Sequence, residues 1–435
     1  MRSVRFEPSG ALRGEYTPPA DKSISHRAAL FGAMCDEPVP VRNFLDSTDT
    51  RSTLAALLKL GAGVEEVDGD VLIRGVGLRA PLEATGGLLD VGNAGTLMRL
   101  LPGWLAGQPG GVWTLDGDES IRRRPVDRVA EPLSAMGAEV EAREGRFPPL
   151  TVRGAQLSGI EYELPVPSAQ VKSCVLIAGL LADGSTTVRE GAQSRDHTER
   201  LLRRARVPFV RDGLRLTVSQ VDELELDEIV VPGDPSSAAF VVAAATLVAG
   251  SRVVVEGLDL NWTRTGFLRI AERMGAVILG DLEEPGTEAD EEPVGELDVA
   301  STPLEGTVVE PDEVPTAIDE LTLVALLGAF ADGETRVRGA GELRVKESDR
   351  IAGAVEGLRG LGADIEATDD GFVVGGDGTP LRGGVIEARG DHRMAMLGAV
   401  AGLASSEGVE VVGMDAAAVS YPGFERDLGM LLEVD

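Results

Sequence analysis

The sequence repeats one pattern six times: a short polar signature opens an apolar stretch of helical length. An internal period limits the possible folds more than any single motif does, because every copy has to form the same local unit. Each signature contains Ser, Thr, Asp, Asn or Gly, the residue types preferred where a helix begins. The six signatures are residues 21–27, 92–96, 168–173, 233–237, 316–320 and 390–394. We therefore predict six apolar helices that each start at a polar residue.

The segment after each apolar stretch repeats as well. A strand, a loop and a second, amphipathic helix follow, and an extra β-hairpin completes the unit. Four of the second helices end in Met-Gly-Ala or Leu-Gly-Ala, at residues 60–62, 136–138, 274–276 and 361–363. Glycine fits the position that ends a helix, because it adopts the left-handed backbone conformation at low cost. The pattern predicts an α/β protein made of six such units.

Six units in 435 residues exceed what one hydrophobic core normally holds, so we divide them as three plus three. The Pro-Gly pair at residues 232–233 interrupts two β-rich runs and marks the divide. The strand at residues 3–8 comes before the first unit, and we expect it to pair with the second half of the chain. The predicted domains are residues 18–231 and residues 1–17 with 232–435, and the two chain crossings between them form a hinge.

The chain is strongly acidic, with 72 Asp and Glu against 41 Lys and Arg and a formal net charge of −31. Nucleic acids and anionic membranes bind positively charged surfaces, so we expect neither as a partner. We also expect no signal peptide and no membrane span, because the apolar helices are short and interrupted by polar residues. The prediction is a cytoplasmic monomer. We interpret the acid-rich run at residues 281–298 as a solvated loop or hairpin without chemistry.

Cations gather at the signatures. Three of the four lysines, Lys22, Lys172 and Lys346, lie inside a signature or a loop. A cation at a helix start opposes the helix dipole and needs a compensating anion, whereas the free backbone N–H groups there attract anions themselves. Arginine adds a planar fork that binds carboxylate or phosphate through two hydrogen bonds. The arginines in such positions are Arg27, Arg99, Arg122, Arg123, Arg124, Arg350 and Arg393.

An ion pair with a protein carboxylate is the alternative for any one of these arginines. As a set at repeated positions, they favour a small-molecule ligand that carries two anionic groups. Two carboxylates stand among them. Asp319 follows Thr316 by three residues, which predicts a capping box at a helix start, and Glu347 fits a helix start equally well. The alternative for both is catalysis, because a carboxylate held among cations stays ionised and is poised to accept a proton.

Other catalytic patterns are missing from the sequence. No phosphate loop, His-Glu-x-x-His, Cys-x-x-Cys or Gly-x-Ser-x-Gly motif occurs in a convincing setting. The three histidines, His26, His197 and His392, are far apart in the sequence, which argues against a zinc site. We therefore expect neither a metal ion nor a cofactor.

Taken together, eight motifs closely resemble, in order, those of the 5-enolpyruvylshikimate-3-phosphate synthase (3-phosphoshikimate 1-carboxyvinyltransferase) family. They are residues 21–27, 92–96, 124–125, 168–173, 194–199, 233–234, 344–350 and 391–396. The resemblance implies two similar domains, each of three βαβαββ repeats, with the active site in the cleft between them. It also implies transfer of the enolpyruvyl group of phosphoenolpyruvate to the 5-hydroxyl of shikimate 3-phosphate, with release of phosphate, on the pathway to chorismate and aromatic amino acids.

The same resemblance assigns roles to residues of this chain. The residues expected to bind shikimate 3-phosphate are Lys22, Ser23, Arg27, Ser168, Ala169, Gln170, Ser194, Asp319 and Lys346. Those expected to bind phosphoenolpyruvate are Lys22, Gly95, Arg124, Gln170, Arg350 and Arg393. Asp319 and Glu347 are expected to handle protons with help from Lys22. Two departures weaken the family's phosphate contacts: Ala169 stands where some members have Ser, and Val419 where some have Lys.

Three alternatives remain beside this reading. An enolpyruvyl transferase acting on UDP-N-acetylglucosamine has the same fold, but many members carry Cys in the loop that here spans residues 116–125 and Asn where Ser23 stands. An RNA-end-processing enzyme of similar architecture requires a basic surface, which the net charge contradicts. A non-enzymatic anion-binding protein accounts for the cations but leaves Asp319 and Glu347 unexplained.

Overall fold

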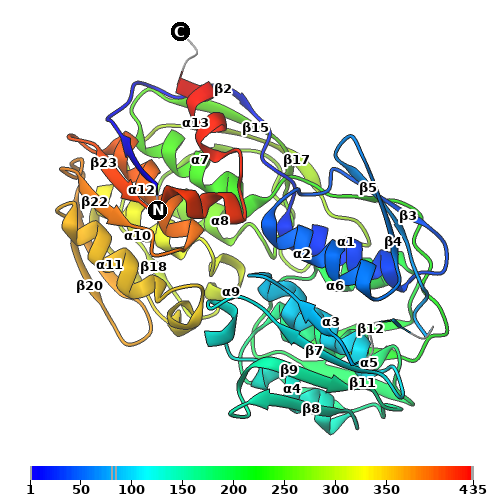
Figure 1. Ribbon diagram of the computed structural model, residues 1–435. Helices are drawn as coiled ribbons and strands as arrows, with labels where there is room; N and C mark the ends of the chain where they lie inside the picture. The colour runs from blue at the N-terminus through cyan, green and yellow to red at the C-terminus, as the bar shows by residue number, and fades with distance from the viewer. Residues whose placement is uncertain (1, 80–81, 84–85, 433–435) are drawn as a thin grey trace. The chain divides into compact units, whose positions relative to one another are not determined.

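The computed structural model describes residues 2–79, 82–83 and 86–432 (Figure 1). Its chain forms two compact units. Unit 1 comprises Met1–Pro19, Pro232–Thr287 and Pro293–Asp435, and unit 2 comprises Ala20–Val231 and Glu288–Glu292. Each unit has its own hydrophobic core. The chain therefore passes from one unit to the other after Pro19 and returns after Val231, with a short excursion at residues 288–292.

Unit 2 contains three sheets of four strands with one shared design. The first two strands are parallel, and the other two run antiparallel to their neighbours. One sheet is β14 (Ile229–Val230), β3 (Val39–Arg42), β5 (Asp70–Arg74) and β4 (Gly63–Val67). The next is β6 (Leu88–Asp90), β7 (Val112–Asp116), β9 (Phe147–Arg153) and β8 (Glu139–Arg143). The third is β10 (Glu161–Glu163), β11 (Ser185–Arg189), β13 (Arg215–Ser219) and β12 (Phe209–Asp212).

Unit 1 repeats this design in two sheets and shortens it in a third. One sheet is β2 (Arg13–Tyr16), β15 (Arg252–Asp259), β17 (Val294–Ala300) and β16 (Val277–Leu279). Another is β18 (Val308–Val309), β19 (Asp332–Val337), β21 (Phe372–Asp377) and β20 (Asp364–Ala367). The three-stranded sheet is β22 (Gly384–Glu387), β23 (Val409–Val412) and β1 (Ser3–Phe6). Figure 1 shows the blue N-terminal strand beside the red-orange β23, and their antiparallel pairing confirms the predicted partner of this strand.

At each of the two chain crossings, a strand lies in one unit and the helix that follows it lies in the other. Strand β2 leads into the first apolar helix of unit 2, yet it pairs with β15 of unit 1. Strand β14 leads into the first apolar helix of unit 1, yet it pairs with β3 of unit 2. Each unit thus completes one of its sheets with a strand whose following helix belongs to the other unit. The predicted boundaries assigned residues 13–16 and 229–230 to these units, but the sequence period did not show which strands they pair with.

Six nearly fully buried helices form the cores. They are α1 (Lys22–Met34), α3 (Gly95–Ala106) and α5 (Ala169–Gly179) in unit 2, and α7 (Pro235–Leu247), α10 (Leu321–Phe330) and α12 (His392–Ala404) in unit 1. In each of the six repeats, one further helix follows the second strand. These helices are α2 (Thr48–Lys59), α4 (Asp127–Ala135), α6 (His197–Arg204), α8 (Gly266–Arg273), α11 (Arg350–Gly360) and α13 (Phe424–Leu432). Among the described residues, no helix combines the length and the apolar character that crossing a membrane requires.

Four of the six core helices begin as the sequence predicts. Helices α1, α5, α7 and α12 start after a residue whose side chain accepts a backbone N–H of the first turn; these residues are Asp21, Ser168, Asp234 and Asp391. The other two do not follow the rule. Helix α3 starts after Ala94 and α10 after Glu320, and neither has a side-chain cap.

The capping box predicted from Thr316 and Asp319 is therefore wrong. A short helix, α9 (Val314–Ala317), forms first, because a proline in its opening turn favours an early start. The Thr316 hydroxyl donates to the carbonyl oxygen of Glu313 at 2.9 Å and caps nothing. Asp319 lies in the break between α9 and α10, which begins at Leu321. Its side chain is thus left for other contacts.

Part of the acid-rich run is not a solvated loop either. Residues 288–292 pack with unit 2. The Arg203 guanidinium lies 2.8 Å from the Glu288 carboxylate, and His197 Nδ1 lies 2.7 Å from Glu292 Oε1. Both partners belong to α6, which is distant in sequence, so the composition of the run gave no sign of the contact. The run supplies counter-charges to a helix.

The packing of α3 against α5 yields a stability prediction. A Cβ atom at Gly103 in α3 would lie 2.3 Å from the carbonyl oxygen of Cys174 in α5, whereas a Cβ at Gly429 in α13 meets nothing within 4 Å. We expect Gly103→Ala to lower the free energy of unfolding by about 1–3 kcal/mol through overpacking. The matched Gly429→Ala should raise it by up to about 1 kcal/mol. Thermal melting checks both, and a Gly103→Ala variant as stable as the parent would contradict the close approach.

Candidate active site

The first candidate cluster lies at the start of α1. The Asp21 side chain accepts the Ile24 N–H at 2.7 Å and so fixes where the helix begins. Lys22 is the first residue of the helix, and its Nζ lies 3.1 Å from Asp49 Oδ2 in α2. The Lys22 side chain remains 21% exposed, so its ammonium is accessible to a ligand as well as to Asp49. Ser23, the next residue, is half-buried.

Arg27, one turn further along α1, is buried and held by neutral oxygens. Its guanidinium donates to Thr198 Oγ1 at 2.8 Å, to Ser173 Oγ at 3.0 Å and to the Ser23 carbonyl at 3.0 Å. Burial lowers the pKa of Arg27 to about 10, so it stays cationic at neutral pH. Among the described residues, no carboxylate lies within ion-pair distance of it. A buried positive charge in this state favours an anionic ligand.

The starts of α3 and α5 meet in a second group. Ser168 caps α5 and Ala169 is its first residue. Gln170 Nε2 donates to Thr96 Oγ1 at 3.1 Å, and its Oε1 accepts from Arg99 at 3.2 Å. These bonds fix the orientation of the Gln170 amide between two helix starts. The sequence identified Gln170 but gave no sign of its partners.

Gly95 is the first residue of α3 and faces two guanidinium groups. A Cβ there would lie 2.8 Å from Arg124 Nη1 and 3.0 Å from Arg99 Nη1, so any side chain would displace one of them. Arg124 also donates to Asn93 Oδ1 at 2.7 Å and to Ser120 Oγ at 3.1 Å. The absence of a side chain at Gly95 leaves the α3 backbone beside concentrated positive charge, which suits a carboxylate or phosphate.

Lys172, by contrast, has its counter-ions inside the protein. Its Nζ lies 2.9 Å from Glu190 Oε2 and 2.6 Å from Glu199 Oε1, and all three side chains are buried. Burial alone would lower the pKa of Lys172, but the two glutamates raise it above its usual value. Burial acts in the opposite direction on the Glu199 carboxyl and raises its pKa. Ser194 donates its hydroxyl to Glu190, so the expected phosphate ligand is tied to this buried triad.

Unit 1 carries its own cluster around Asp319. Asp319 Oδ1 lies 3.3 Å from Lys346 Nζ and 3.3 Å from Arg350 Nη1, and Oδ2 lies 3.9 Å from Arg393 Nη2. Glu347 Oε2 lies 2.6 Å from Arg350 Nη2. The structure therefore brings together all five residues that the sequence nominated in this half of the chain.

Carboxylates hold the two arginines of this cluster in place. Arg350 is 1% exposed and lies 2.9 Å from Asp391, the cap of α12. Burial alone would lower the pKa of Arg350, but Asp391, Glu347 and Asp319 raise it above its usual value. Arg393 donates to the Asp319 carbonyl oxygen at 2.7 Å and lies 3.3 Å from Glu320 Oε1. The partners Asp391 and Glu320 were not expected from sequence.

One further group of charged side chains lies around α6. Asp196, His197 and Glu292 lie close enough together to share a metal ion. The Arg200 guanidinium, however, lies 3.1 Å from Asp196 and 3.5 Å from Glu292, and it already supplies positive charge there. The arrangement therefore fits a buried arginine better than a metal centre.

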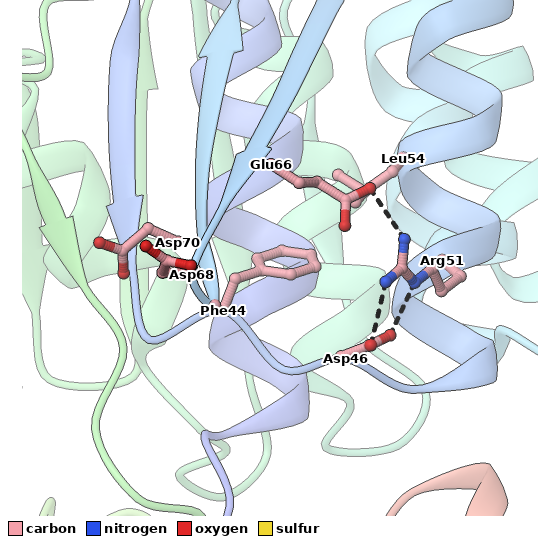
Figure 2. Close-up of a pocket in the computed structure, with 8 residues that line it drawn as sticks. Phe44, Asp46, Arg51, Leu54, Glu66, Asp68 and Asp70 are labelled. Carbon is pink, nitrogen blue, oxygen red and sulfur yellow. Dashed lines mark hydrogen bonds and ion pairs between the residues drawn. The ribbon is translucent and has the colours of Figure 1, made fainter.

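A pocket elsewhere in unit 2 also lacks the expected residues (Figure 2). Its lining consists of Phe44, Asp46, Arg51, Leu54, Glu66, Asp68, Gly69 and Asp70. Arg51 lies 2.6 Å from Asp46 and 2.8 Å from Glu66, as the dashed lines in Figure 2 show. Because its arginine is paired with two carboxylates and the remaining charges are negative, this pocket does not suit an anionic substrate.

Comparison with known proteins shows the family of the chain. The model of the family described as EPSP synthase (3-phosphoshikimate 1-carboxyvinyltransferase) matches residues 6–428. The 3-phosphoshikimate 1-carboxyvinyltransferase of Thermus thermophilus is 46% identical over 430 residues, or 98% of each chain. That of Bacillus licheniformis is 43% identical over 425 residues, which cover 97% of this chain and 98% of the relative.

Two solved structures are similar in fold. EPSP synthase from Acinetobacter baumannii superposes with a TM-score of 0.86 at 39% identity, covering 99% of this chain and 98% of that one. The enolpyruvyl transferase NikO from Streptomyces tendae gives a TM-score of 0.75 at 16% identity, covering 99% and 97%. The second likeness concerns the fold alone.

His26, between Lys22 and Arg27 on α1, yields a pH prediction. Burial and the two neighbouring cations lower its pKa to about 3, against an opposing effect of Asp21. The unfolded chain binds a proton at this histidine below about pH 6.5 and the folded chain does not, so acid favours unfolding. Between about pH 6.5 and pH 3 this group should cost about 1.4 kcal/mol of unfolding free energy per pH unit. Urea titrations of His26→Asn should show a shallower pH slope than the parent; equal slopes would contradict the buried neutral histidine.

Proposed function

Because the chain belongs to the EPSP synthase (3-phosphoshikimate 1-carboxyvinyltransferase) family, we propose that the clusters described above bind and convert the substrates of that reaction. The protein is a transferase of aromatic amino-acid biosynthesis. It moves the enolpyruvyl group of phosphoenolpyruvate to the 5-hydroxyl of shikimate 3-phosphate, and phosphate is released. The observation that carries the residue assignment is that the cations of the family motifs gather within each unit at the starts of buried helices.

Shikimate 3-phosphate is assigned to the residues around Arg27. A phosphate dianion supplies the negative charge that Arg27 lacks, and Lys22 lies five residues before it on the same helix. The capped start of α5 adds backbone N–H groups beside this position. The assigned residues are Lys22, Ser23, Arg27, Ser168, Ala169, Gln170, Ser194, Asp319 and Lys346. Ser194 can accept a hydrogen bond but has to release Glu190 before it donates one.

Phosphoenolpyruvate is assigned to the arginine-rich positions. The close approach of Arg124 to Gly95 offers a guanidinium and an uncovered backbone to one anionic group. Arg350 and Arg393, each fixed by carboxylates, offer two further forks. The assigned residues are Lys22, Gly95, Arg124, Gln170, Arg350 and Arg393. Two substrates that repel one another are then held together by preorganised cations.

Proton transfer is assigned to Asp319 and Glu347, with assistance from Lys22. In the addition step, the 5-hydroxyl oxygen attacks C2 of phosphoenolpyruvate and loses its proton, while the methylene carbon C3 gains one. In the elimination step, C3 gives up a proton and phosphate leaves, which regenerates the double bond. Asp319, which lies among three cations, is assigned as the base, and Glu347 beside Arg350 is the second carboxylate of the same cluster.

The chain is also proposed to act as a cytoplasmic monomer, without a metal ion or cofactor. The supporting features are its acidic net charge and a cluster chemistry that uses fixed cations for every anionic group. Size-exclusion chromatography with light scattering checks the oligomeric state, and activity after exhaustive chelation checks the metal. A dimer or a chelator-sensitive rate would contradict the respective proposal.

Phosphate release with phosphoenolpyruvate and two competing acceptors tests the reaction. We expect release with shikimate 3-phosphate and none above background with UDP-N-acetylglucosamine. Turnover of the sugar nucleotide alone would move the chain to the other enolpyruvyl transferase reaction.

A single substitution tests the catalytic carboxylate. Asp319→Asn preserves shape but removes charge and proton affinity, so we expect kcat to fall roughly 100-fold or more. Because Asp319 caps no helix, the melting temperature should change little. The control is Asp312→Asn, which alters an exposed carboxylate seven residues earlier and should leave kcat unchanged. An unchanged kcat in Asp319→Asn would shift the proton chemistry to Glu347 or Lys22.

A further inference from the structure

Lys22 has a buried partner that no family motif nominated. Asp49 is the second residue of α2, and its Oδ2 lies 3.1 Å from Lys22 Nζ. The Asp49 side chain is 6% exposed, against 21% for Lys22. The aspartate is thus enclosed by protein while the ammonium keeps access to a ligand. The enclosed Asp49 carboxylate is therefore placed to hold the more exposed Lys22 ammonium in position.

A second polar contact fixes the two helices against each other. His26 is four residues after Lys22 on α1, and Thr53 is four residues after Asp49 on α2. His26 Nδ1 lies 2.6 Å from Thr53 Oγ1, and both residues are buried. Residues four apart lie on one face of a helix, so the two contacts form successive rungs between α1 and α2. The contact between His26 and Thr53 sets the register of the two helices that brings Asp49 to Lys22.

Besides lying in the first turn of α2, where an acid is favourable, the Asp49 carboxylate has Lys22 as its ion-pair partner among the described residues. Its Oδ1 is buried and has no hydrogen-bond partner among the described residues. A buried carboxylate oxygen without a partner is unfavourable, and such groups tend to persist where they serve a function. Asp46, three residues earlier, differs: its side chain is 72% exposed and pairs with Arg51. Within the described part of the chain, Lys22 is the cation that pairs with Asp49.

We propose that Asp49 is a positioning residue, which holds the Lys22 ammonium in place before the substrates arrive. The proposal rests on the role assigned to Lys22 above. A lysine side chain has four rotatable bonds and no fixed geometry, so its charge has to be localised by a partner. Asp49 localises it at the start of α1, where it can serve both anionic substrates without moving. The carboxylate also repels those anions, so positioning comes at a cost in binding.

This cost gives the proposal a signature that a structural role lacks. Asp49→Asn keeps the shape and removes the charge. We expect kcat to fall roughly 10- to 100-fold, because a misplaced group loses about this much. The dissociation constant for shikimate 3-phosphate, measured by calorimetry, should change less than kcat, because the loss of the carboxylate's repulsion offsets the looser hold on Lys22. A loss of binding together with kcat, or a wild-type kcat, would overturn the proposal.

Control variants separate this proposal from the proposed function. Asp46→Asn removes an acid from the loop just before α2 and should leave kcat and binding unchanged. Lys22→Met should abolish most activity, and adding Asp49→Asn to it should cause no further loss, since Asp49 acts through Lys22. An active Lys22→Met would overturn the role of Lys22 itself. An inactive Lys22→Met beside a fully active Asp49→Asn would overturn only the inference about Asp49.

Asp49→Glu provides a second test that keeps the fold and the charge. The extra methylene displaces the carboxylate, so kcat should lie between those of the parent and Asp49→Asn. A value no higher than that of Asp49→Asn would show that charge at this position is not what Lys22 needs. Should Asp49→Asn fail to fold, the comparison of Asp49→Glu with the parent replaces it. An unchanged kcat in Asp49→Glu would then contradict the proposal.

Discussion

The burial of six apolar helices is the constraint on which the rest of the structure depends. Every residue of α7 except Leu247 is buried, and every residue of α12 except Ala404. A helix that is apolar on all sides is stable only where strands and other helices cover it completely. Polar groups are then confined to the ends of these helices, where backbone N–H groups need partners. Charged side chains collect at those ends for the same reason.

The buried cations differ in whether a carboxylate of the protein neutralises them. Lys172 is neutralised by Glu190 and Glu199, and Arg350 by three carboxylates. Arg27 is held by hydroxyl and carbonyl oxygens only. Burying a charge is costly unless an opposite charge accompanies it. The proposed phosphate would supply that opposite charge at Arg27, whereas Glu190 and Glu199 supply it at Lys172. Three cations of similar appearance in the sequence thus have different roles.

The sequence anticipated the members of the candidate site better than their surroundings. Its motifs named Asp319, Lys346, Glu347, Arg350 and Arg393, and the structure places these side chains in one cluster. They were recognisable because each lies in a compact motif with fixed spacing. The partners Glu320 of Arg393 and Asp49 of Lys22 were not recognisable, because an acid in an acid-rich chain carries no sign of its partner. The contact between the run at residues 288–292 and α6 was missed on the same grounds.

What the sequence determined by itself is everything that repeats locally. Backbone preference and apolar periodicity act over a few residues. They determine the six-fold order of helices and strands, the three-plus-three arrangement, and the polar helix starts at Asp21, Ser168, Asp234 and Asp391. Only the tertiary structure decided which distant segments meet. It paired β2 with β15 and β14 with β3, left Asp319 between two helices, and brought Asp49 to Lys22. These outcomes depend on how whole repeats pack and on the register of one helix against another, and no local pattern in the chain encodes either.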